Sequence, residues 1–298
     1  MMDIRDACFE TLYSIAKEDR DVILLTDDMG AYTLEKFKSD LPKQYYNVGI
    51  AEQNMVSVAA GLALAGKKPF LYGISAFMSS RCYEQLKLDV CVMNLPVTVI
   101  GTGPGLSYGG DGPTHHAVQD TAVLSTLPEL SIYNPADAVS TAAIVKLAYK
   151  SDKPVYIRLE KGVLPTIYDV RYDFSLGFKE LKQGRDTLIV STGAIVHNIL
   201  EVVTNCKEDI GSFGVLDMFC IKPLNFSRLK AVLSCYSSVV TEEETVNVLG
   251  NKVQEVFAKE LPLKCLHLPD KHIFECGDRE YIKSLYGLDG RSIRNYVI

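Results

Sequence analysis

One carboxylate, Glu52, stands in a setting that could support acid–base chemistry. It follows residues 46–51 and precedes residues 56–66, an apolar segment rich in glycine and alanine. The spacing of these small residues predicts a closely packed helix with Glu52 at its start. A carboxyl group in an apolar interface has a raised pKa and can hold a proton, as a general acid must. The ordinary alternative is a glutamate that stabilises a helix start through the helix dipole.

A glycine-rich stretch, residues 101–112, holds a second set of candidate residues. It contains six glycines after a strand-like segment, and Asp111 and His115 stand four residues apart at its exit. In a parallel sheet, ligands bind at the carboxyl ends of the strands, where glycine lets the backbone approach closely. We therefore expect a ligand site here. The alternative for His115 and His116 is a capping or surface position at the start of the next helix.

Apolar strand-like segments alternate with helical patterns along the chain, as in a parallel sheet covered on both faces. The expected strands are residues 22–26, 69–74, 97–100, 130–133, 155–159, 187–193, 212–218 and 238–241, and the expected helices include residues 3–18, 78–93, 136–150 and one near 116–125. This pattern predicts an α/β fold of two doubly wound domains with mainly parallel sheets. We expect the domains at residues 1–160 and 186–298, joined by a linker at 161–185.

The composition argues against several classes of protein. The 298 residues carry a net charge of −6 without a long basic cluster, which argues against nucleic-acid binding. No apolar run approaches the roughly 20 residues that a membrane span needs, and the N-terminus lacks the apolar core of a signal peptide. The eight cysteines form no CxxC pair, which favours reduced, buried thiols over disulfides or a zinc site. We expect a cytoplasmic protein that contacts neither membranes nor nucleic acid.

Three motifs together resemble the transketolase family of thiamine diphosphate enzymes. They are Ile-Ala-Glu-Gln-Asn-Met at residues 50–55, Ser-Ala-Phe at 75–77 with Arg-Cys-Tyr-Glu-Gln at 81–85, and Asp-Gly-Pro-Thr-His at 111–115. The last motif is the most specific, and it favours transketolase and deoxyxylulose-phosphate synthase over the beta subunits of 2-oxoacid dehydrogenases. The resemblance covers nearly the whole chain. Residues 1–160 are similar to the family's pyrimidine-binding domain, and residues 191–290 are similar to its C-terminal domain.

The resemblance implies roles around the cofactor. Glu52 matches the glutamate that hydrogen-bonds the N1′ atom of the aminopyrimidine ring and so activates thiamine diphosphate. Phe77 matches the aromatic residue that packs on this ring, with Tyr83 as a second wall. Asp27 matches an acidic residue near the cofactor at the subunit interface. For Phe77 and Tyr83 the alternative is an ordinary place in the core of an amphipathic helix.

The resemblance also implies roles toward the substrate. His115 matches a catalytic histidine that contacts the substrate's hydroxyl and carbonyl oxygens, and Asp111 matches the aspartate that reads its C2 hydroxyl. Arg5 and Arg158 match arginines that hold a sugar phosphate, although a surface salt bridge is the alternative for Arg5. Transketolases usually carry a histidine eight residues before this aspartate, where the present chain has Gly103. We expect either that the missing side chain widens or re-aims the donor site, or that the donor is not an ordinary pentose-pathway sugar phosphate.

The family's domain for the cofactor's diphosphate and metal has no counterpart in this sequence. Its mark is Gly-Asp-Gly followed at a distance by Asn. Residues 110–112 with Asn134 imitate that mark, but Asp111 belongs to the signature motif, so we assign no metal site to this chain. The resemblance implies the C-terminal half of a split transketolase. Such a chain forms a homodimer and joins a separate N-terminal subunit as an α2β2 heterotetramer, in which that partner supplies the ligands of the diphosphate and of Mg2+ or Ca2+.

The implied activity is the transfer of a two-carbon ketol unit from a ketose or ketose phosphate to an aldose or aldose phosphate. The enzyme would be active only with its N-terminal partner. Two alternatives stay open. A beta subunit of a 2-oxoacid dehydrogenase would decarboxylate a 2-oxoacid and pass an acyl group to lipoamide, and a non-catalytic regulatory subunit would keep the fold without chemistry.

Overall fold

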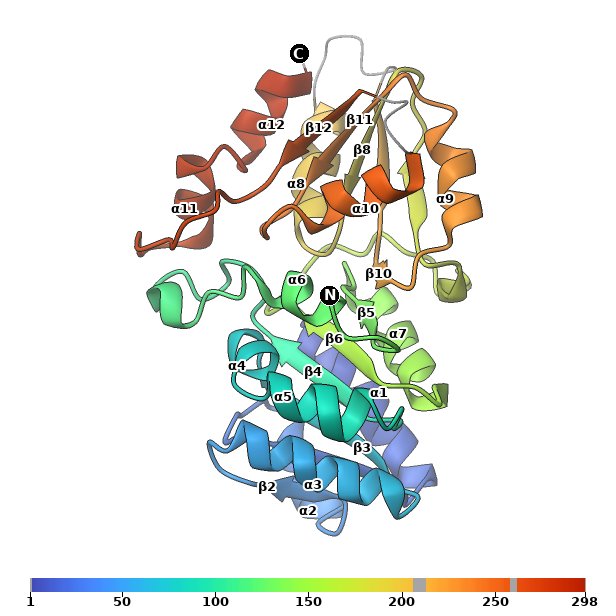
Figure 1. Ribbon diagram of the computed structural model, residues 1–298, viewed down its shortest axis with the longest axis vertical. Coiled ribbons are helices and arrows are strands. Elements are labelled where there is room, and N and C mark those ends of the chain that lie inside the picture. Colours follow the sequence, from blue (N-terminus) through green and yellow to red (C-terminus); the bar gives the residue numbers. More distant parts are fainter. Residues whose placement is uncertain (1, 206–212, 258–261, 298) are drawn as a thin grey trace.

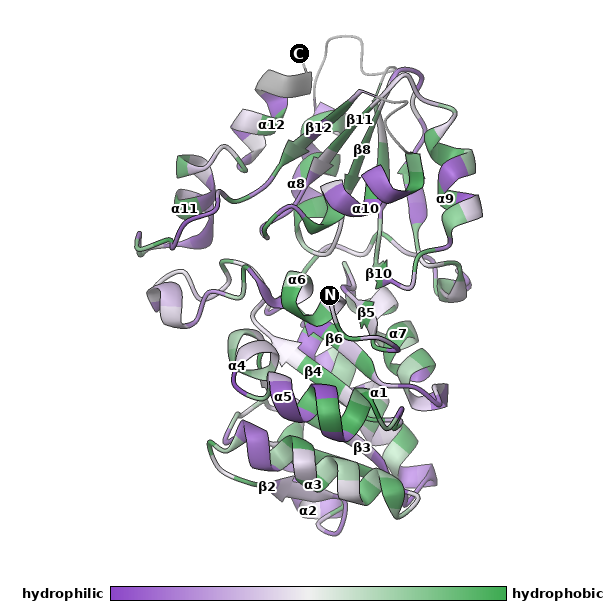
Figure 2. Ribbon diagram, viewed as in Figure 1, coloured by the Kyte–Doolittle hydropathy of each residue, from purple (hydrophilic) through white to green (hydrophobic). Residues whose placement is uncertain are grey.

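Two mainly parallel sheets, one in each half of the chain, organise the computed structural model, which describes residues 2–205, 213–257 and 262–297. They belong to two α/β domains that lie one above the other in Figure 1, with the N-terminal domain below. Apolar residues make up much of both sheets, as the green stretches of their strands in Figure 2 show. The predicted fold class is confirmed. Cys206 and Ser212, the latter expected to begin a strand, lie outside the described residues.

The first sheet has seven strands in the order β10-β5-β6-β4-β3-β1-β2. Their bounds are β1 (Val22–Thr26), β2 (Tyr45–Asn47), β3 (Lys68–Ile74), β4 (Thr98–Thr102), β5 (Ser131–Tyr133), β6 (Val155–Leu159) and β10 (Cys220–Lys222). All neighbours run parallel except β10, which pairs antiparallel with β5. Strands β1, β4 and β6 bury every residue, because helices cover both faces of the sheet. They therefore have continuous apolar sequences.

Helices cover both faces of this sheet. One face carries α1 (Ile4–Glu18), α2 (Leu34–Asp40) and α7 (Ala138–Lys150), and the other carries α3 (Glu52–Leu64), α4 (Ser75–Ser80), α5 (Tyr83–Gln85), the π-helix η1 (Leu86–Cys91) and α6 (Asp120–Ser125). A single 3-10 turn, η2 (Gly112–Thr114), lies in the glycine-rich loop. Ala59, Ala60 and Ala63 of α3 pack into the core of their own domain. The small residues thus seat α3 on its own sheet, while Val58 and Leu64 are exposed.

The second sheet has five strands in the order β12-β11-β8-β9-β7. Its strands are β7 (Lys179–Lys182), β8 (Thr187–Ser191), β9 (Phe213–Asp217), β11 (Ser238–Glu242) and β12 (Leu263–Leu266), with α8 (Ile195–Asn205), α9 (Phe226–Leu233), α10 (Val248–Phe257), α11 (Arg279–Leu285) and α12 (Gly290–Val297) around them. The 3-10 turn η3 (Phe174–Leu176) instead packs on α7 of the first domain. The strands run parallel except β7, which is antiparallel to β9. Strand β7 falls inside the range expected to be a linker, so the domain limits at 160 and 186 stay a prediction.

The structure differs from the expected elements in two places. The helix expected at 78–93 is divided into α4, α5 and η1, with a turn at residues 81–82. Strand β10 comes from the second half of the chain but completes the first sheet. The two domains are therefore joined by a shared sheet as well as by the connecting segment.

Seven cysteines lie in the described residues, and all of them are free thiols. Cys8, Cys82, Cys91 and Cys220 are buried, as predicted, whereas Cys235 and Cys276 are exposed. Among the described residues, no helix combines the length and the apolar character needed to cross a lipid bilayer.

Candidate functional site

Several predicted site residues lie at the carboxyl ends of neighbouring strands in the first sheet. Asp27 follows β1, Glu52 begins α3 after β2, and Phe77 lies in α4 directly after β3. The glycine-rich loop with Asp111 and His115 follows β4. Strands β2, β1, β3 and β4 are consecutive neighbours in the sheet. These residues therefore share the end of the sheet where α/β folds bind ligands.

Glu52 is buried but has a partner. Arg81, which follows α4, donates a hydrogen bond from Nη1 to Oε1 of Glu52 over 2.8 Å. The guanidinium group also lies over the ring of Phe77, with Cζ 3.6 Å from the ring centroid. A planar cation thus stacks on Phe77 while it donates to Glu52. The local sequence around Glu52 predicts no such partner, because Arg81 comes 29 residues later.

Asp27 is a second buried carboxyl group at this place. Its side chain is almost fully covered, and its Oδ1 atom makes no hydrogen bond within the described residues. Burial raises the pKa of Asp27 to about 7, with the negative charge of Glu52 as the second cause and with Arg81 acting in the opposite direction. Asp27 therefore lies close enough to Glu52 to feel its charge. An acid with such a pKa can gain or lose a proton near neutral pH.

His115 joins Phe77 to the glycine-rich loop. The ring centroids of His115 and Phe77 are 5.0 Å apart in an edge-on contact, and those of His115 and Tyr108 are 5.8 Å apart. The Oγ1 atom of Thr114 lies 2.9 Å from Nδ1 of His115 and orients the imidazole. Asp111, on the same loop, is exposed. The structure thus brings Phe77 and His115 together and leaves Asp111 open to a ligand.

Arg5 faces the same end of the sheet. The backbone N–H of its neighbour Ile4 bonds the carbonyl of Gly162 over 3.0 Å, which ties the start of α1 to the segment after β6. The guanidinium group of Arg5 pairs with Asp3 at 3.3 Å. Burial is the main influence on the pKa of Lys161, and the positive charge of Arg5 lowers that pKa further. Arg5 is therefore near the site but already has one carboxylate partner.

Arg158, expected to hold a sugar phosphate, is buried and paired within the protein. It lies in β6, whose residues are all buried, and its Nε atom donates to Oδ2 of Asp120 over 2.8 Å. Its Nη2 atom donates to the carbonyl of Ala117 over 3.1 Å. The guanidinium group is thus a buried partner of α6, and a phosphate could reach it only by breaking this ion pair.

Tyr83 does not form the predicted second wall beside Phe77. Its hydroxyl lies 2.7 Å from Oγ1 of Thr126, and its ring packs against the core of the first domain. The reason is the turn at residues 81–82, which ends α4 and moves Tyr83 off the helical face that carries Phe77.

Tyr108 and Lys161 also belong to this end of the sheet, although no motif singled them out. Lys161 comes two residues after β6, and its Nζ atom lies 3.4 Å from the centroid of the Tyr108 ring. It makes no ion pair within the part of the chain that the structure describes. The signals were present in the sequence. Tyr108 is the one aromatic residue in the glycine-rich loop, and Lys161 follows a strand end as Asp27 does.

The glycines of the loop make close contacts with the protein itself. A Cβ atom on Gly105 would lie 2.4 Å from Oε2 of Glu244, and one on Gly109 would lie 2.5 Å from the carbonyl oxygen of Gly277. A Cβ atom on Gly112 would meet Sγ of Cys276 at 3.3 Å. All three neighbours belong to the C-terminal half of the chain. We expected these glycines to let a ligand approach the backbone. This explanation is incomplete, because at least three of them let the loop pack closely against the second domain.

An ion-pair network holds the same contact. Arg279 of α11 donates to both oxygens of Glu160 and to both of Glu244, at 2.9 Å each. Glu244 also accepts a hydrogen bond from the backbone N–H of Leu106 over 3.1 Å. Burial would raise the pKa of Glu244, but the charge of Arg279 holds it below its ordinary value. Arg279 thus connects the end of β6, the second domain and the loop that carries His115.

Asp111 and Asn134, which together imitate the family's metal mark, lie in different surroundings, since Asp111 is exposed and Asn134 is buried. Asn134 is buried against Gly193, whose Cβ position lies 2.6 Å from Nδ2 of Asn134. Within the described ranges, no group of three or more His, Cys, Asp or Glu side chains is arranged to hold a metal ion.

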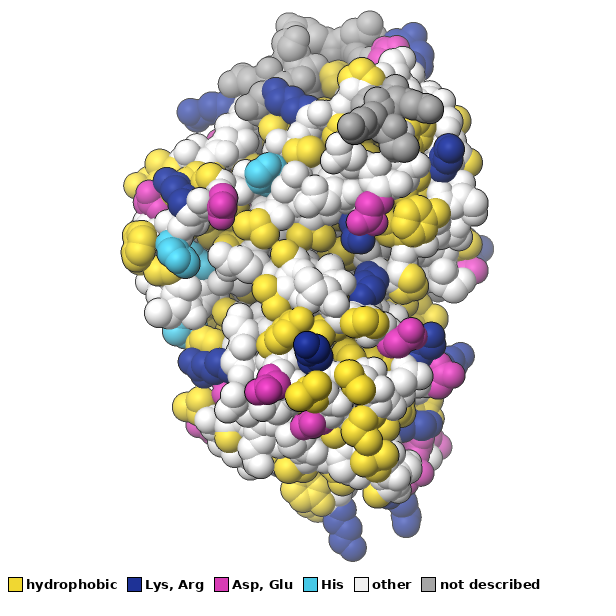
Figure 3. Space-filling view, in the orientation of Figure 1, with side chains coloured by type: hydrophobic (Ala, Val, Ile, Leu, Met, Phe, Trp, Pro, Cys, Tyr) yellow, Lys and Arg dark blue, Asp and Glu magenta, His cyan; other side chains and the backbone are white. Residues whose placement is uncertain are grey.

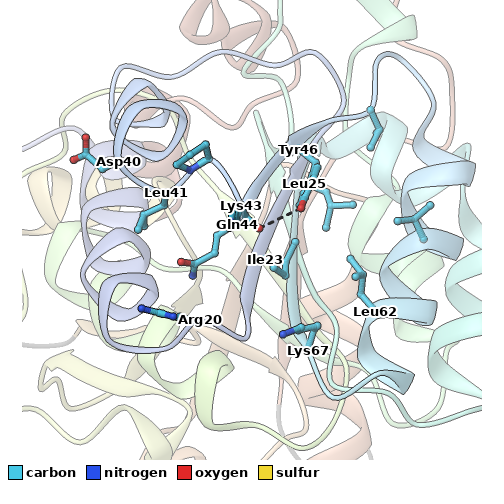
Figure 4. Close-up of a pocket in the computed structure, with 13 residues that line it drawn as sticks. Arg20, Ile23, Leu25, Asp40, Leu41, Lys43, Gln44, Tyr46, Leu62 and Lys67 are labelled. Atoms are coloured by element: carbon cyan, nitrogen blue, oxygen red, sulfur yellow. Dashed lines mark hydrogen bonds between the residues drawn. The ribbon is translucent and has the colours of Figure 1, made fainter.

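A groove of about 860 Å³ lies elsewhere on the first domain, between α2, β2 and α3 (Figure 4). Its walls include Ile23, Leu25, Leu41 and Leu62, and the hydroxyl of Tyr46 donates to the carbonyl of Lys43 at its edge. None of the predicted site residues lines this groove. The site residues and this groove are therefore separate features.

Comparison with known proteins gives matches along the whole chain. Residues 1–166 match the family model described as the pyrimidine-binding domain of transketolase, and residues 177–293 match that of the transketolase C-terminal domain. The chain is 33% identical over 299 residues to a subunit of the apulose-4-phosphate transketolase of Phocaeicola vulgatus, covering 98% of this chain and 96% of that protein. It is 31% identical to "6-deoxy-6-sulfo-D-fructose transketolase subunit SqwH" of Clostridium sp., covering 97% and 92%.

A solved structure described as "Split gene transketolase, inactive beta4 tetramer" superposes with a TM-score of 0.89 at 30% identity. The match covers 100% of this chain and 97% of that one. The similarity therefore extends over both domains and their relative arrangement.

Proposed function

The chain belongs to the transketolase family, and on that premise we propose that it is the C-terminal subunit of a thiamine diphosphate-dependent ketol transferase. Such an enzyme moves a two-carbon ketol unit from a ketose or ketose phosphate to an aldose. The observation that carries the proposal is the arrangement of Glu52, Phe77 and His115 at one end of the first sheet.

The residues present fit the aminopyrimidine half of the cofactor. The guanidinium group of Arg81 is a planar cation that stacks on Phe77 and donates an N–H to Glu52. A protonated aminopyrimidine ring is also planar, positively charged and an N–H donor, so the acceptor and the aromatic surface suit it. When bound, thiamine diphosphate supplies the nucleophilic carbon that takes up the ketol unit.

The roles of the buried acids follow from their surroundings. Glu52 accepts a hydrogen bond from the aminopyrimidine and holds the proton shared with it, which requires Arg81 to release the carboxylate. Because 47% of the Arg81 side chain is exposed, it can turn outward into solvent. Asp27 lies next to this carboxylate as a mostly protonated acid below pH 7 and limits the negative charge there.

The substrate lies on the His115 side of the site in this proposal. His115 contacts the hydroxyl and carbonyl oxygens of the sugar, and exposed Asp111 accepts a hydrogen bond from a sugar hydroxyl. Arg5 and Lys161 offer positive charge to an anionic group at the far end of the sugar. We therefore propose sugar phosphates or similar anionic sugars as substrates, in keeping with the names of the two relatives.

We also propose that the active enzyme contains a separate N-terminal subunit. The side of α3, η1 and the turn after η1 that faces away from the sheet exposes Val58, Leu64, Leu88, Val92 and Met93. Figure 3 shows hydrophobic side chains gathered over this lower half of the molecule. Such a patch favours association with another chain. The partner would supply the ligands of the diphosphate and of Mg2+ or Ca2+, in an α2β2 heterotetramer.

Ketol transfer measured with and without the N-terminal subunit tests the proposal. The assay offers xylulose 5-phosphate, fructose 6-phosphate and hydroxypyruvate as donors, with ribose 5-phosphate as acceptor. We expect turnover only in the mixture and only with thiamine diphosphate and a divalent cation. Turnover of a 2-oxoacid with a lipoyl acceptor, without any ketol transfer, would contradict the proposal.

A further inference from the structure

Gly103 and Tyr108 share one volume in the glycine-rich loop. A Cβ atom built on Gly103 would lie 2.0 Å from Cε2, 2.5 Å from Cδ2 and 3.2 Å from Cζ of Tyr108. The backbone of Gly103 has φ +74°, which side chains rarely adopt. The ring of Tyr108 therefore fills the space that a side chain at position 103 would need. The volume that the missing side chain leaves is therefore filled by the tyrosine and does not by itself widen the site.

Tyr108 also lies in the middle of the proposed substrate site. Its ring is a neighbour of His115 on one side, and Nζ of Lys161 lies over its face. Burial raises the pKa of the Tyr108 phenol above its ordinary value. The positive charge of Arg5 acts to lower this pKa, and the negative charges of Asp111 and Asp27 act to raise it. Tyr108 therefore stays a neutral hydrogen-bonding group at physiological pH, within the electrostatic reach of residues assigned to cofactor or substrate.

We propose that Tyr108 determines which donor sugar this enzyme accepts, by taking the place of the histidine that transketolases usually carry at the position of Gly103. This inference rests on the proposed function. The phenol offers an apolar face and one neutral hydroxyl, whereas an imidazole offers a group that gains a positive charge as the pH falls. The ring also holds the ammonium group of Lys161 by a cation–π contact. It thereby sets the position at which this ammonium group can contact the substrate.

Thermal unfolding of the isolated chain tests whether the Tyr108 ring occupies the space that a side chain at position 103 would need. Gly103→His should lower Tm by about 5–10 °C, because the new side chain strains the backbone and overlaps the Tyr108 ring. Gly110→His is the matched control, since Gly110 has open space around its Cβ position and no positive φ. Adding Tyr108→Val to Gly103→His should recover part of the loss. Equal effects of the two histidine variants, or no recovery, would overturn the assigned packing.

Donor choice is tested in the assembled enzyme with its N-terminal subunit. The measured quantity is the ratio of kcat/KM for fructose 6-phosphate to kcat/KM for xylulose 5-phosphate. Tyr108→Val opens the site and should shift this ratio at least about tenfold toward the longer donor. Tyr108→Phe, which keeps the ring and Lys161 in place, should give a smaller shift. Tyr13→Val, which replaces a half-buried tyrosine bonded to Asp40, is the control.

The outcomes separate this inference from the proposed function. An active wild type whose donor ratio stays within about twofold in Tyr108→Val contradicts the inference alone. A wild-type complex that turns over no ketose donor contradicts the proposed function, and the inference with it.

Discussion

Glu52 is the residue on which the proposed chemistry depends. Glu52→Gln keeps the shape of the side chain but removes the acidic proton shared with the aminopyrimidine. Exchange of the C2 proton of thiamine diphosphate, followed by NMR in the assembled enzyme, should slow by about 10²–10⁴-fold. The control is Glu84→Gln, which changes an exposed glutamate of α5. Near-normal exchange in Glu52→Gln would show that another group activates the cofactor.

Arg81 competes with the cofactor for Glu52 and Phe77 in this account. Arg81→Gln should therefore tighten thiamine diphosphate binding by the assembled enzyme by about three- to tenfold, because no ion pair must first be broken. Lys87→Gln removes the same charge from an exposed position in η1 and should leave the affinity unchanged. Calorimetry measures both. Weaker binding in Arg81→Gln would mean that Arg81 supports the bound cofactor and does not exclude it.

Asp27 makes the stability of the chain depend on pH. Its pKa is about 7 in the folded chain, whereas the ordinary value, which applies to the unfolded chain, is 3.8. Between these values the folded chain keeps a proton that the unfolded chain has lost, so stability falls as the pH rises. Asp27→Asn should remove this loss of stability at higher pH, because asparagine does not titrate. The free energy of unfolding in urea should rise relative to wild type by about 2 kcal/mol between pH 5 and pH 8.

The matched control for this pH effect is Asp152→Asn, at an exposed position before β6. It should follow the wild-type pH profile. If Asp27→Asn follows that profile too, Asp27 does not hold its proton in the folded chain.

Site residues could be predicted from sequence where short motifs fix them. Glu52, Phe77 and His115 stand in such motifs, and the structure brings them together. The ion pair of Arg158 could not be predicted in this way, because the direction of a side chain in a wholly buried strand depends on the helix packed against it, here α6 with Asp120. Tyr108 belongs to none of the motifs, and its position depends on the folded path of the loop. Its contact with Gly103 could therefore not be predicted from the sequence.

At the scale of elements, the glycine-rich loop depends on the second domain for its position. Arg279→Met would leave the buried carboxylate of Glu160 without its cation, and Glu244 with only Lys283, whose Nζ atom lies 3.9 Å from Oε1. The chain should lose about 3–5 kcal/mol of stability in urea unfolding. In Arg171→Met, by contrast, an exposed pair with Asp169 is lost, and the unfolding curve should not move. A small loss in Arg279→Met would show that backbone contacts suffice to hold the loop.

Elements with strong local patterns were predicted well, and those set by distant contacts were not. The strands at 22–26 and 155–159 are present with the predicted bounds, because their mainly apolar residues suit a covered sheet. The helix expected at 78–93 is divided by a turn at residues 81–82. At this turn the side chain of Arg81 points toward Glu52 and donates a hydrogen bond to it. Strand β10 has three residues and forms through a pairing with β5 far away in sequence. No local pattern indicates that pairing.

At the scale of the whole molecule, the site is one half of a binding site in this account. The described residues provide an acceptor and an aromatic surface for the aminopyrimidine, but no group of acids arranged for a metal ion. The exposed apolar side of α3 and η1 suggests where other chains associate. The chain alone should therefore self-associate and bind the cofactor weakly, and light scattering should show at least a dimer.

Calorimetric titration of thiamine diphosphate into this chain, into the N-terminal subunit, and into their mixture tests the central claim most directly. Each titration is run with Mg2+ and again with a chelator. We predict stoichiometric, metal-dependent binding only in the mixture. Stoichiometric, metal-dependent binding by this chain on its own would contradict the account.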